Sequence, residues 1–290
     1  MIDGELVLIH GFWSSPRTWD SIVTQMRVDG DLEGLEIDAF RYESPKVRLP
    51  LMPTRIPDYD DIAHSLGAQL ALKDAARPLV IVTHSQGGLI LQRHLAWMVH
   101  EGRAHELARV RAIVLLACPN EGSEYLGTIR RALGFGRHPQ AGQLRTLVTD
   151  ATDARRTFLK SIVHATELTD RTCPIPVYAY AGRTDNVVTR ASAQSVYPNV
   201  STLPGNHSSI LKPNYPGSLT VQTLKAHIVH AFSGAGGTAP KRSTSSTSGT
   251  LSSAGSAKTA GSKYNVTLND NQGVSIGDNN IQNNDFGYRS

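Results

Sequence analysis

The chain has 290 residues, of which 40% are hydrophobic and 19% charged, and its formal net charge is +4. This length and composition suit one α/β domain with a sizeable core plus an appendage, and they exclude a wholly disordered, collagen-like or coiled-coil protein. The positive charge does not indicate nucleic-acid binding, because part of it falls in one low-complexity stretch, at Lys241, Arg242, Lys258 and Lys263. Two cysteines are too few for a disulfide framework or a structural zinc site.

The start of the sequence bears on location. Residues Met1 to Glu5 carry no basic region of a signal peptide, and no apolar run reaches the roughly 20 residues that span a bilayer. We therefore expect a soluble, cytoplasmic protein, unless secretion uses a route that the sequence does not show.

Short apolar runs alternate with longer amphipathic runs up to Phe232. The expected strands, in chain order, are Glu5–Ile9, Leu35–Phe40, Leu79–Thr83, Arg111–Ala117, Val177–Ala181 and Asn199–Leu203. The expected helices are Pro16–Arg27, Asp60–Ala75, Gly87–Leu107 and Pro216–His230. This alternation, with several strands apolar throughout, predicts an α/β fold in which helices cover both faces of a mostly parallel sheet.

Two insertions and a C-terminal extension complete the predicted organisation. Ser44–Asp58 is rich in proline and should form an irregular loop. Asn120–Thr172 is too long for a simple connection and contains helical patterns, including 143–148 and 155–163, so we expect a cap or lid there. We assign residues 1–232 to the folded domain, 233–263 to a flexible linker rich in Ser, Gly, Ala and Thr, and 264–290 to a separate motif.

The strongest sign of chemistry is the run Leu-Val-Ile-Val-Thr-His-Ser-Gln-Gly-Gly at residues 79–88. An apolar strand leads into Ser85, and a helix is expected directly after it. A serine at such a tight turn projects its hydroxyl away from the sheet, and the N–H of Gln86 points to where a carbonyl oxyanion would form. The two glycines that follow let strand and helix approach closely, whereas Thr83 is larger than the glycine usual there. The alternative is a serine that only caps the helix.

This run resembles the nucleophile elbow of the α/β-hydrolase superfamily, and the resemblance extends over about Gly4–Phe232. The superfamily places its oxyanion loop after an early strand, and the His-Gly-Phe run at residues 10–12 is similar to that loop. The resemblance implies an oxyanion hole made by the amides of Phe12 and Gln86, with His10 as a buried residue that orients the loop. Members often begin with an antiparallel hairpin before this strand, so we expect here a truncated sheet of roughly six strands.

A serine becomes nucleophilic only when a base takes its proton, and the base needs an orienting carboxylate. In the superfamily that the sequence resembles, the order is serine, acid, histidine. Asp185 and His207 each follow a predicted strand, Asp185 in a segment similar to the superfamily's acid loop. We therefore predict Ser85, Asp185 and His207 as a catalytic triad, because the C-terminal ends of parallel strands lie at one edge of the sheet.

Each of these two assignments has an alternative. Asp185 could be an ordinary turn aspartate. His227 and His230 compete with His207, but both lie within the last predicted helix and should face solvent or the core.

The segment Ala-Cys-Pro-Asn-Glu-Gly-Ser at residues 117–123 resembles a segment of lipase-like members. Together with the expected cap, it favours a serine esterase acting on a lipid or other hydrophobic ester, with a transient contact to a membrane surface. The enzymatic alternative is an acyl-protein thioesterase or a peptidase. This chemistry requires no metal or organic cofactor. We expect Cys118 and Cys173 to be free thiols, because opposite ends of neighbouring strands lie about 20 Å apart.

Residues 264–290 alternate aliphatic and polar side chains and are rich in Asn. Such spacing, with little charge and no proline, suits strands that stack in register. The run Gly-Val-Ser-Ile-Gly-Asp-Asn-Asn-Ile-Gln at 273–282 resembles the RHIM-related amyloid signalling motifs, although Ser275 replaces their usual Gln or Asn. The resemblance implies an immune or cell-death effector recruited by a signalling receptor with a matching motif. The alternatives are a docked hairpin, a disordered end, or a non-catalytic interaction protein that acts only through this tail.

Overall fold

The computed structural model describes residues 1–11, 14–42, 59–119, 151–186, 197–213 and 218–233. Its centre is a six-stranded sheet in the order β2-β1-β3-β4-β5-β6, in which all neighbouring strands run parallel. The strands are β1 (Gly4–Ile9), β2 (Leu35–Ala39), β3 (Leu79–His84), β4 (Val110–Leu116), β5 (Val177–Gly182) and β6 (Asn199–Leu203). The predicted α/β fold is confirmed, and no antiparallel strand joins the sheet within the described residues.

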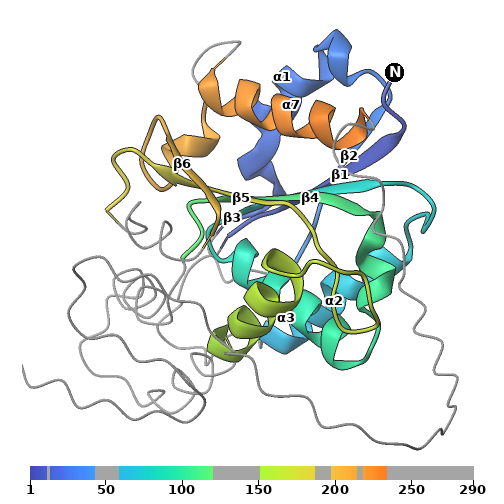
Figure 1. Ribbon diagram of the computed structural model, residues 1–290. Helices are drawn as coiled ribbons and strands as arrows, with labels where there is room; N and C mark the ends of the chain where they lie inside the picture. The colour runs from blue at the N-terminus through green and yellow to red at the C-terminus, as the bar shows by residue number, and fades with distance from the viewer. Residues whose placement is uncertain (12–13, 43–58, 120–150, 187–196, 214–217, 234–290) are drawn as a thin grey trace, which may run out of the picture. The chain divides into compact units, whose positions relative to one another are not determined.

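Helices cover both faces of the sheet (Figure 1). One face carries α1 (Asp20–Arg27) and α7 (Leu219–Phe232), and the other carries α2 (Tyr59–Ala71) and α3 (Gly87–His100). Residues 151–158 are also α-helical and continue into the π-helical turn η4 (Leu159–Val163). The short 3₁₀ turns are η1 (Pro16–Trp19), η2 (Gly30–Leu32), η3 (Ala104–Arg109) and η5 (Ser209–Leu211).

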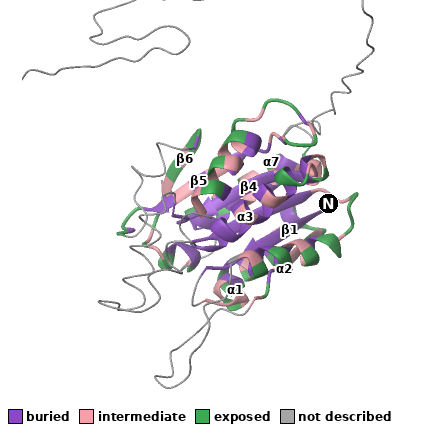
Figure 2. Ribbon diagram, turned by 90° about the horizontal axis from the view of Figure 1, so that it is seen from below, coloured by how far each residue is buried: buried purple, intermediate pink, exposed green. Residues whose placement is uncertain are grey.

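Alternating side chains of the central strands enter two separate cores. Along β3, Val80 and Val82 pack with α1 and α7, whereas Leu79 and Ile81 pack with α2 and α3. All six residues of β1 and of β3 are buried, and Figure 2 shows this for β1. Both strands are accordingly mostly apolar, and their polar members Glu5, Thr83 and His84 are buried as well. The sheet is therefore packed on both faces, and its following loops start from buried strands.

The helix ends correct several sequence expectations. The predicted helix Gly87–Leu107 ends at His100, because Gly102 takes a left-handed conformation with φ of +73°. The N–H of Gly102 donates to the carbonyl of Val99, and the N–H of Arg103 donates to the carbonyl of Met98. These two bonds form the Schellman motif that ends a helix. The remainder of the predicted helix forms the separate turn η3.

The other predicted helices shift by a few residues. Pro16–Arg27 begins with the turn η1 and becomes α-helical only from Asp20. The helix predicted as Asp60–Ala75 ends at Ala71, because the chain then turns at Asp74, whose carboxylate accepts the N–H of residue 76. The last helix begins at Leu219 rather than at residue 216, because Ser218 caps it.

The insertion predicted as a cap falls into two parts. The described part, residues 151–172, packs under the sheet beside α3: Ala154, Phe158 and Ile162 are buried, and the latter two contact the core of that face. This part therefore belongs to the helical layer on that face, and the predicted cap stays a prediction for residues 120–150. Residues 120–150 lie outside the described residues, as do the loop 43–58, most of the predicted linker and the whole tail 264–290.

Candidate active site

Ser85 occupies a strained turn between β3 and α3. Its φ of +52° lies in the left-handed region, which non-glycine residues rarely adopt. The Ser85 N–H donates to the carbonyl of Leu116 on β4 over 3.0 Å, and α3 begins two residues later at Gly87. The turn therefore presents Ser85 at the C-terminal edge of the sheet, beside the positive end of a helix.

Close backbone approach explains the glycines around this turn. A Cβ on Gly87 would lie 2.5 Å from the carbonyl oxygen of Ile9 and 2.7 Å from that of His10. A Cβ on Gly11 would lie 2.8 Å from Cβ of Ser85. The loop that follows β1 thus lies directly against the serine, and only glycine fits at these two positions.

The structure brings Ser85, His207 and Asp185 together. His207 Nε2 lies 2.9 Å from Ser85 Oγ, and its Nδ1 lies 3.1 Å from Asp185 Oδ2. The Asp185 side chain is fully shielded from solvent, and that of His207 is 22% exposed. Hence the serine hydroxyl can donate to Nε2 while Nδ1–H donates to the carboxylate.

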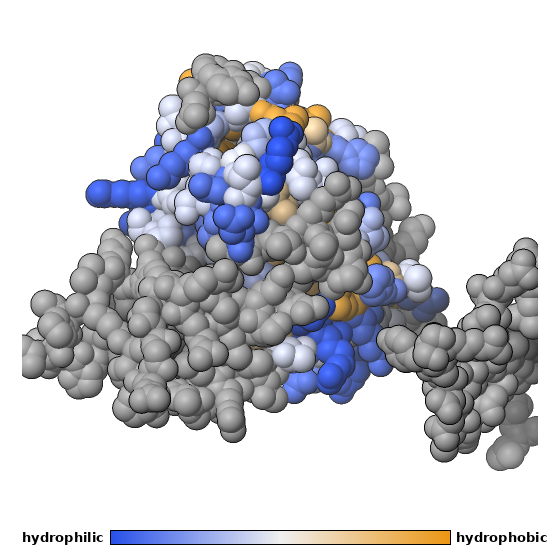
Figure 3. Space-filling view, turned by 90° about the vertical axis from the view of Figure 1, so that its left-hand side faces the viewer, coloured by the Kyte–Doolittle hydropathy of each residue, from blue (hydrophilic) through white to orange (hydrophobic). Residues whose placement is uncertain are grey.

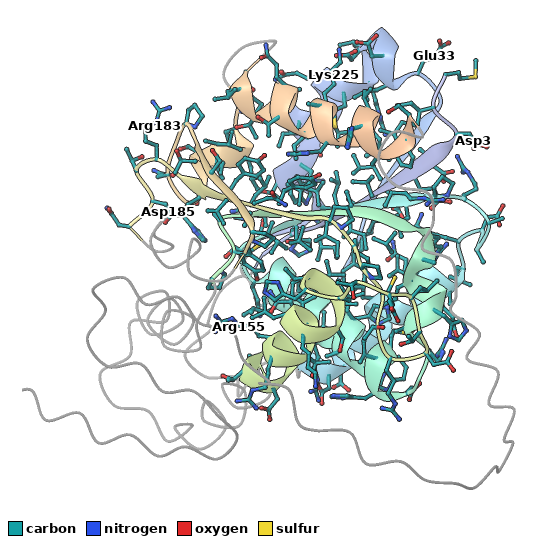
Figure 4. The ribbon with its side chains drawn as sticks, in the orientation of Figure 1. Asp3, Glu33, Arg155, Arg183, Asp185 and Lys225 are labelled. Carbon is teal, nitrogen blue, oxygen red and sulfur yellow. The ribbon has the colours of Figure 1, made fainter. Side chains whose placement is uncertain are left out.

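The loops after β5 and β6 hold the acid and the histidine side by side. The N–H of Arg183 donates to the carbonyl of Leu203, and that of Thr184 to the carbonyl of Gly205. Gly205 has a φ of +106°, which L side chains rarely adopt, so the loop before His207 requires glycine there. Arg183 and Asp185 project at one edge of the sheet (Figure 4).

The competing histidines lie elsewhere. His227 is on α7, stacks on Tyr178 with ring centroids 3.9 Å apart, and lies 2.6 Å from the Tyr180 hydroxyl. His230 is exposed on the same helix. Neither is hydrogen-bonded to Ser85 or to Asp185 among the contacts of the described chain, so the geometry favours His207.

The expected oxyanion residues are only partly described. Gln86 lies at the N-terminus of α3 and is 4% exposed, whereas Phe12 lies outside the described residues. His10 is buried as expected; its Nδ1 lies 2.9 Å from the carbonyl oxygen of Gly11, and its ring stacks on Tyr42. The Tyr42 hydroxyl donates to the His10 carbonyl over 2.9 Å, so Tyr42 fixes the start of the loop.

The sequence profile of the alpha/beta hydrolase family matches residues 6–229. The chain belongs to the alpha/beta hydrolase family. This membership supports a hydrolase in general, without naming the bond that is cleaved. No curated protein sequence matches the chain.

Several solved structures are similar to this chain. ClbQ from the colibactin NRPS/PKS pathway has a TM-score of 0.50 and 12% identity, covering 79% of this chain and 98% of its own. YbtT, a type II thioesterase from the yersiniabactin pathway, has a TM-score of 0.47 and 14% identity, covering 80% of this chain and 95% of its own. An extracellular alpha/beta-hydrolase from a Paenibacillus species has a TM-score of 0.46 and 15% identity, covering 79% of this chain and 99% of its own. At 12% identity the likeness to ClbQ concerns the fold alone.

Sequence reasoning missed two residues of this alpha/beta hydrolase that support the site. Tyr42 holds the loop after β1, as described above. His84, the residue before Ser85, lies with Nε2 2.8 Å from the backbone oxygen of His207. The position of His84 beside the serine was a signal in the sequence, but its partner lies more than a hundred residues away and only the folded loops reveal it.

The surroundings of the site bear on other chemistries. Within the described residues, no group of three or more His, Cys, Asp or Glu side chains could hold a metal ion, and no helix could cross a membrane. Burial raises the pKa of the Cys118 thiol to about 12, so this neighbouring thiol stays protonated and is no competing nucleophile. Viewed from the side on which Asp185 lies, the described surface is mostly hydrophilic with small apolar patches (Figure 3).

Proposed function

We propose that this alpha/beta hydrolase cleaves carboxylic esters by acyl transfer through a serine nucleophile. Ser85 Oγ attacks the carbonyl carbon while His207 Nε2 takes its proton. Asp185 holds Nδ1–H and stabilises the imidazolium that forms. His207 then protonates the leaving alcohol, and water hydrolyses the acyl-enzyme by the same steps in reverse.

The negative oxygen of the tetrahedral intermediate needs donors that are already in place. The amide of Gln86, at the N-terminus of α3, is one such donor in this proposal, and the amide of Phe12 is the other. The nearness of Gly11 to Ser85 supports this arrangement, because it places the loop after β1 next to the attacking oxygen. The reaction requires no cofactor.

The observation that carries the proposal is the unbroken hydrogen-bond chain from Ser85 through His207 to Asp185. A serine that only capped a helix would need neither a histidine base nor a shielded carboxylate behind it. The strained φ of Ser85 adds to this, because backbone strain is kept where it serves a reactive geometry.

A fluorophosphonate probe tests the proposal, since it labels only an activated serine. The wild-type protein should be labelled, and Ser85→Ala should not. Ser208→Ala is a matched control, because Ser208 is exposed and adjacent to His207, and it should label like the wild type. Absence of labelling in the wild type would contradict the proposal and favour the interaction protein whose hydrolase fold is a passive scaffold.

For the substrate, we propose a lipid or other hydrophobic ester, on the resemblance of residues 117–123 to lipase-like members. An acyl-protein thioesterase or a peptidase remains the alternative. Rates on p-nitrophenyl esters of increasing acyl length, on acyl thioesters and on phospholipid vesicles distinguish a lipid or hydrophobic ester substrate from a thioester. A rate that rises with acyl length on oxygen esters supports the lipid; a preference for thioesters contradicts it.

For recruitment, we propose that a receptor bearing a similar motif templates residues 264–290 and so concentrates the enzyme near a membrane surface. Full-length protein seeded with the peptide 264–290 should give a thioflavin response, and the variant Ile276→Lys should not, since a charge cannot enter a stacked apolar interface. A seeded wild-type protein that stays monomeric would contradict this proposal. The cytoplasmic location stays a prediction.

A further inference from the structure

His84 ends β3 and directly precedes the serine. The alternation along the strand places its side chain on the same face as Val80 and Val82, which is the face covered by α1 and α7. His84 is only 7% exposed. It therefore lies beneath the loop that carries His207, and it cannot approach a substrate from solvent.

The contact between His84 and His207 involves a backbone oxygen. His84 Nε2 lies 2.8 Å from the carbonyl oxygen of His207, and the two rings have centroids 5.2 Å apart. A carbonyl oxygen only accepts, so His84 must carry its proton on Nε2 and donate it. The interaction thus holds the main chain of His207 and leaves both nitrogens of the His207 ring for Ser85 and Asp185.

The protonation of His84 agrees with this role. Burial, and after it the neighbouring His207, lower the pKa of His84 to about 4, so the ring is neutral near pH 7. Its Nδ1 is shielded from solvent and has no hydrogen-bond partner in the part of the chain that the structure describes. An unpartnered buried acceptor reduces stability, so an apolar residue would serve the core better at this position. The fold keeps the histidine for the donor on its other nitrogen.

The loop that carries His207 shows the effect of the hydrogen bond donated by His84 Nε2–H. Residues 204–208 connect β6 to η5. Before His207, the carbonyl of Gly205 accepts the N–H of Thr184, and Asn206 Oδ1 accepts the N–H of Ser209. Among the hydrogen bonds of the described residues, the bond from His84 is the one that reaches the main chain of residue 207 itself. Because His84 and Ser85 share a peptide bond, it ties the backbone of the base to the nucleophile over a very short path. The same loop brings His207 Nε2 to 2.9 Å from Ser85 Oγ.

We infer that His84 is a positioning residue, which donates from Nε2 to the carbonyl of His207 and so holds that imidazole in line with the Ser85 hydroxyl. This inference rests on the proposed function, because it requires His207 to be the base. His84 touches neither the substrate nor the reacting atoms.

Three substitutions at one position test the inference. His84→Gln places an amide donor at about the reach of Nε2, His84→Asn carries the same amide one methylene shorter, and His84→Leu removes the donor at similar volume. Misplacing a base by about 1 Å costs on the order of 100-fold in rate. We therefore expect kcat for a p-nitrophenyl ester to fall about 10- to 100-fold in the Asn and Leu variants, with KM within about 2-fold, and to recover to within about 5-fold in His84→Gln.

The outcomes separate this inference from the proposed function. If the wild type is not labelled by a fluorophosphonate, the proposed function fails. If the wild type is labelled and His84→Asn reacts as fast as His84→Gln, the function stands and the positioning role is overturned. A purely structural role would lower the melting temperature of all three variants without the split between Gln and Asn, which also overturns it. Should His84→Leu not fold, the comparison of Gln with Asn still decides.

Discussion

Thr83 Oγ1 lies 3.2 Å from Cys118 Sγ, next to the turn that carries Ser85. Both residues are buried. A Cβ on Gly88 would lie 2.7 Å from the same sulfur and 3.3 Å from the same hydroxyl. The space that a glycine at position 83 would leave open is therefore filled by the threonine and the cysteine together, and Gly88 supplies the small residue that lets α3 approach.

This packing predicts a coupled stability effect. Gly88→Ala should reduce the free energy of unfolding by about 1–3 kcal/mol, because its Cβ would overlap the side chain of Cys118. In a Cys118→Ala background the sulfur is gone, and the reduction should be smaller. Urea unfolding of the four proteins in the cycle measures this coupling.

Gly30→Ala is the control for that cycle, because Gly30 is exposed and no atom lies within 4 Å of the added Cβ. Its free energy of unfolding should change by less than about 1 kcal/mol. An equal cost of Gly88→Ala in both backgrounds would show that the sulfur is not the obstacle.

Asp185→Asn should show whether Asp185 orients the His207 ring without contributing to the stability of the fold. The amide keeps the size of the carboxylate, but it cannot hold His207 in the tautomer with Nδ1 protonated or stabilise the imidazolium. We expect kcat on an activated ester to fall by about 10³- to 10⁴-fold with little change in melting temperature. A loss of less than 10-fold would mean that Asp185 does not orient the base.

Acid should destabilise the protein through its buried histidines. For His94, as for His84, burial is the main cause that lowers the pKa from 6.5 to about 4, while Arg103 and His64 add to the effect on His94. Between these two values the unfolded chain binds protons that the folded chain excludes. The free energy of unfolding is therefore fully retained above about pH 6.5 and falls as the pH drops towards 4, by up to about 3 kcal/mol for each histidine.

Urea unfolding at pH 7 and at pH 4.5 measures this loss. His94→Gln should make the protein lose less stability between the two pH values than the wild type does. His164→Gln is the matched control, since His164 is exposed and should leave the difference unchanged. A difference that is the same in His94→Gln and in the wild type would exclude His94 as a cause.

A buried ion pair anchors the start of β1. Glu5 is 4% exposed, and its carboxylate lies 3.1 Å from the Lys73 ammonium, which also lies 3.1 Å from Asp38. Lys73→Met should cost about 2–4 kcal/mol, because among the described residues it leaves the buried Glu5 with the more distant Arg77, at 3.6 Å, as its one cationic partner. The double variant with Glu5→Gln should recover part of that loss in urea unfolding.

The exposed pair of Arg156 with Asp153 is the comparison for this prediction. Arg156→Ala should change the free energy of unfolding by less than about 1 kcal/mol, since solvent screens such a pair. If Lys73→Met cost no more than Arg156→Ala, burial would not be the source of the effect at Glu5.

Much of the fold was predictable because its signals are local. A strand buried on both faces is mostly apolar, as residues 79–82 of β3 are, and parallel strands then place their following loops at one edge. For this reason the residues Ser85, Asp185 and His207 could be chosen from sequence. Helix ends were less predictable: Gly102 stops α3 through two backbone bonds, although apolar and helix-forming residues continue beyond it.

The sequence alone determined the class of fold, because the apolar pattern of strands and helices needs no knowledge of distant contacts. Its resemblance to the nucleophile elbow and acid loop of the superfamily indicated the three residues of the candidate site. Only the tertiary structure decided that residues 151–172 lie under the sheet, that Thr83 packs on Cys118, and that His84 reaches the carbonyl of His207. Each of these depends on where two segments, far apart along the chain, come to lie against each other. Such a contact is set to within tenths of an ångström by the packing of the whole domain, and no local pattern of residues encodes it.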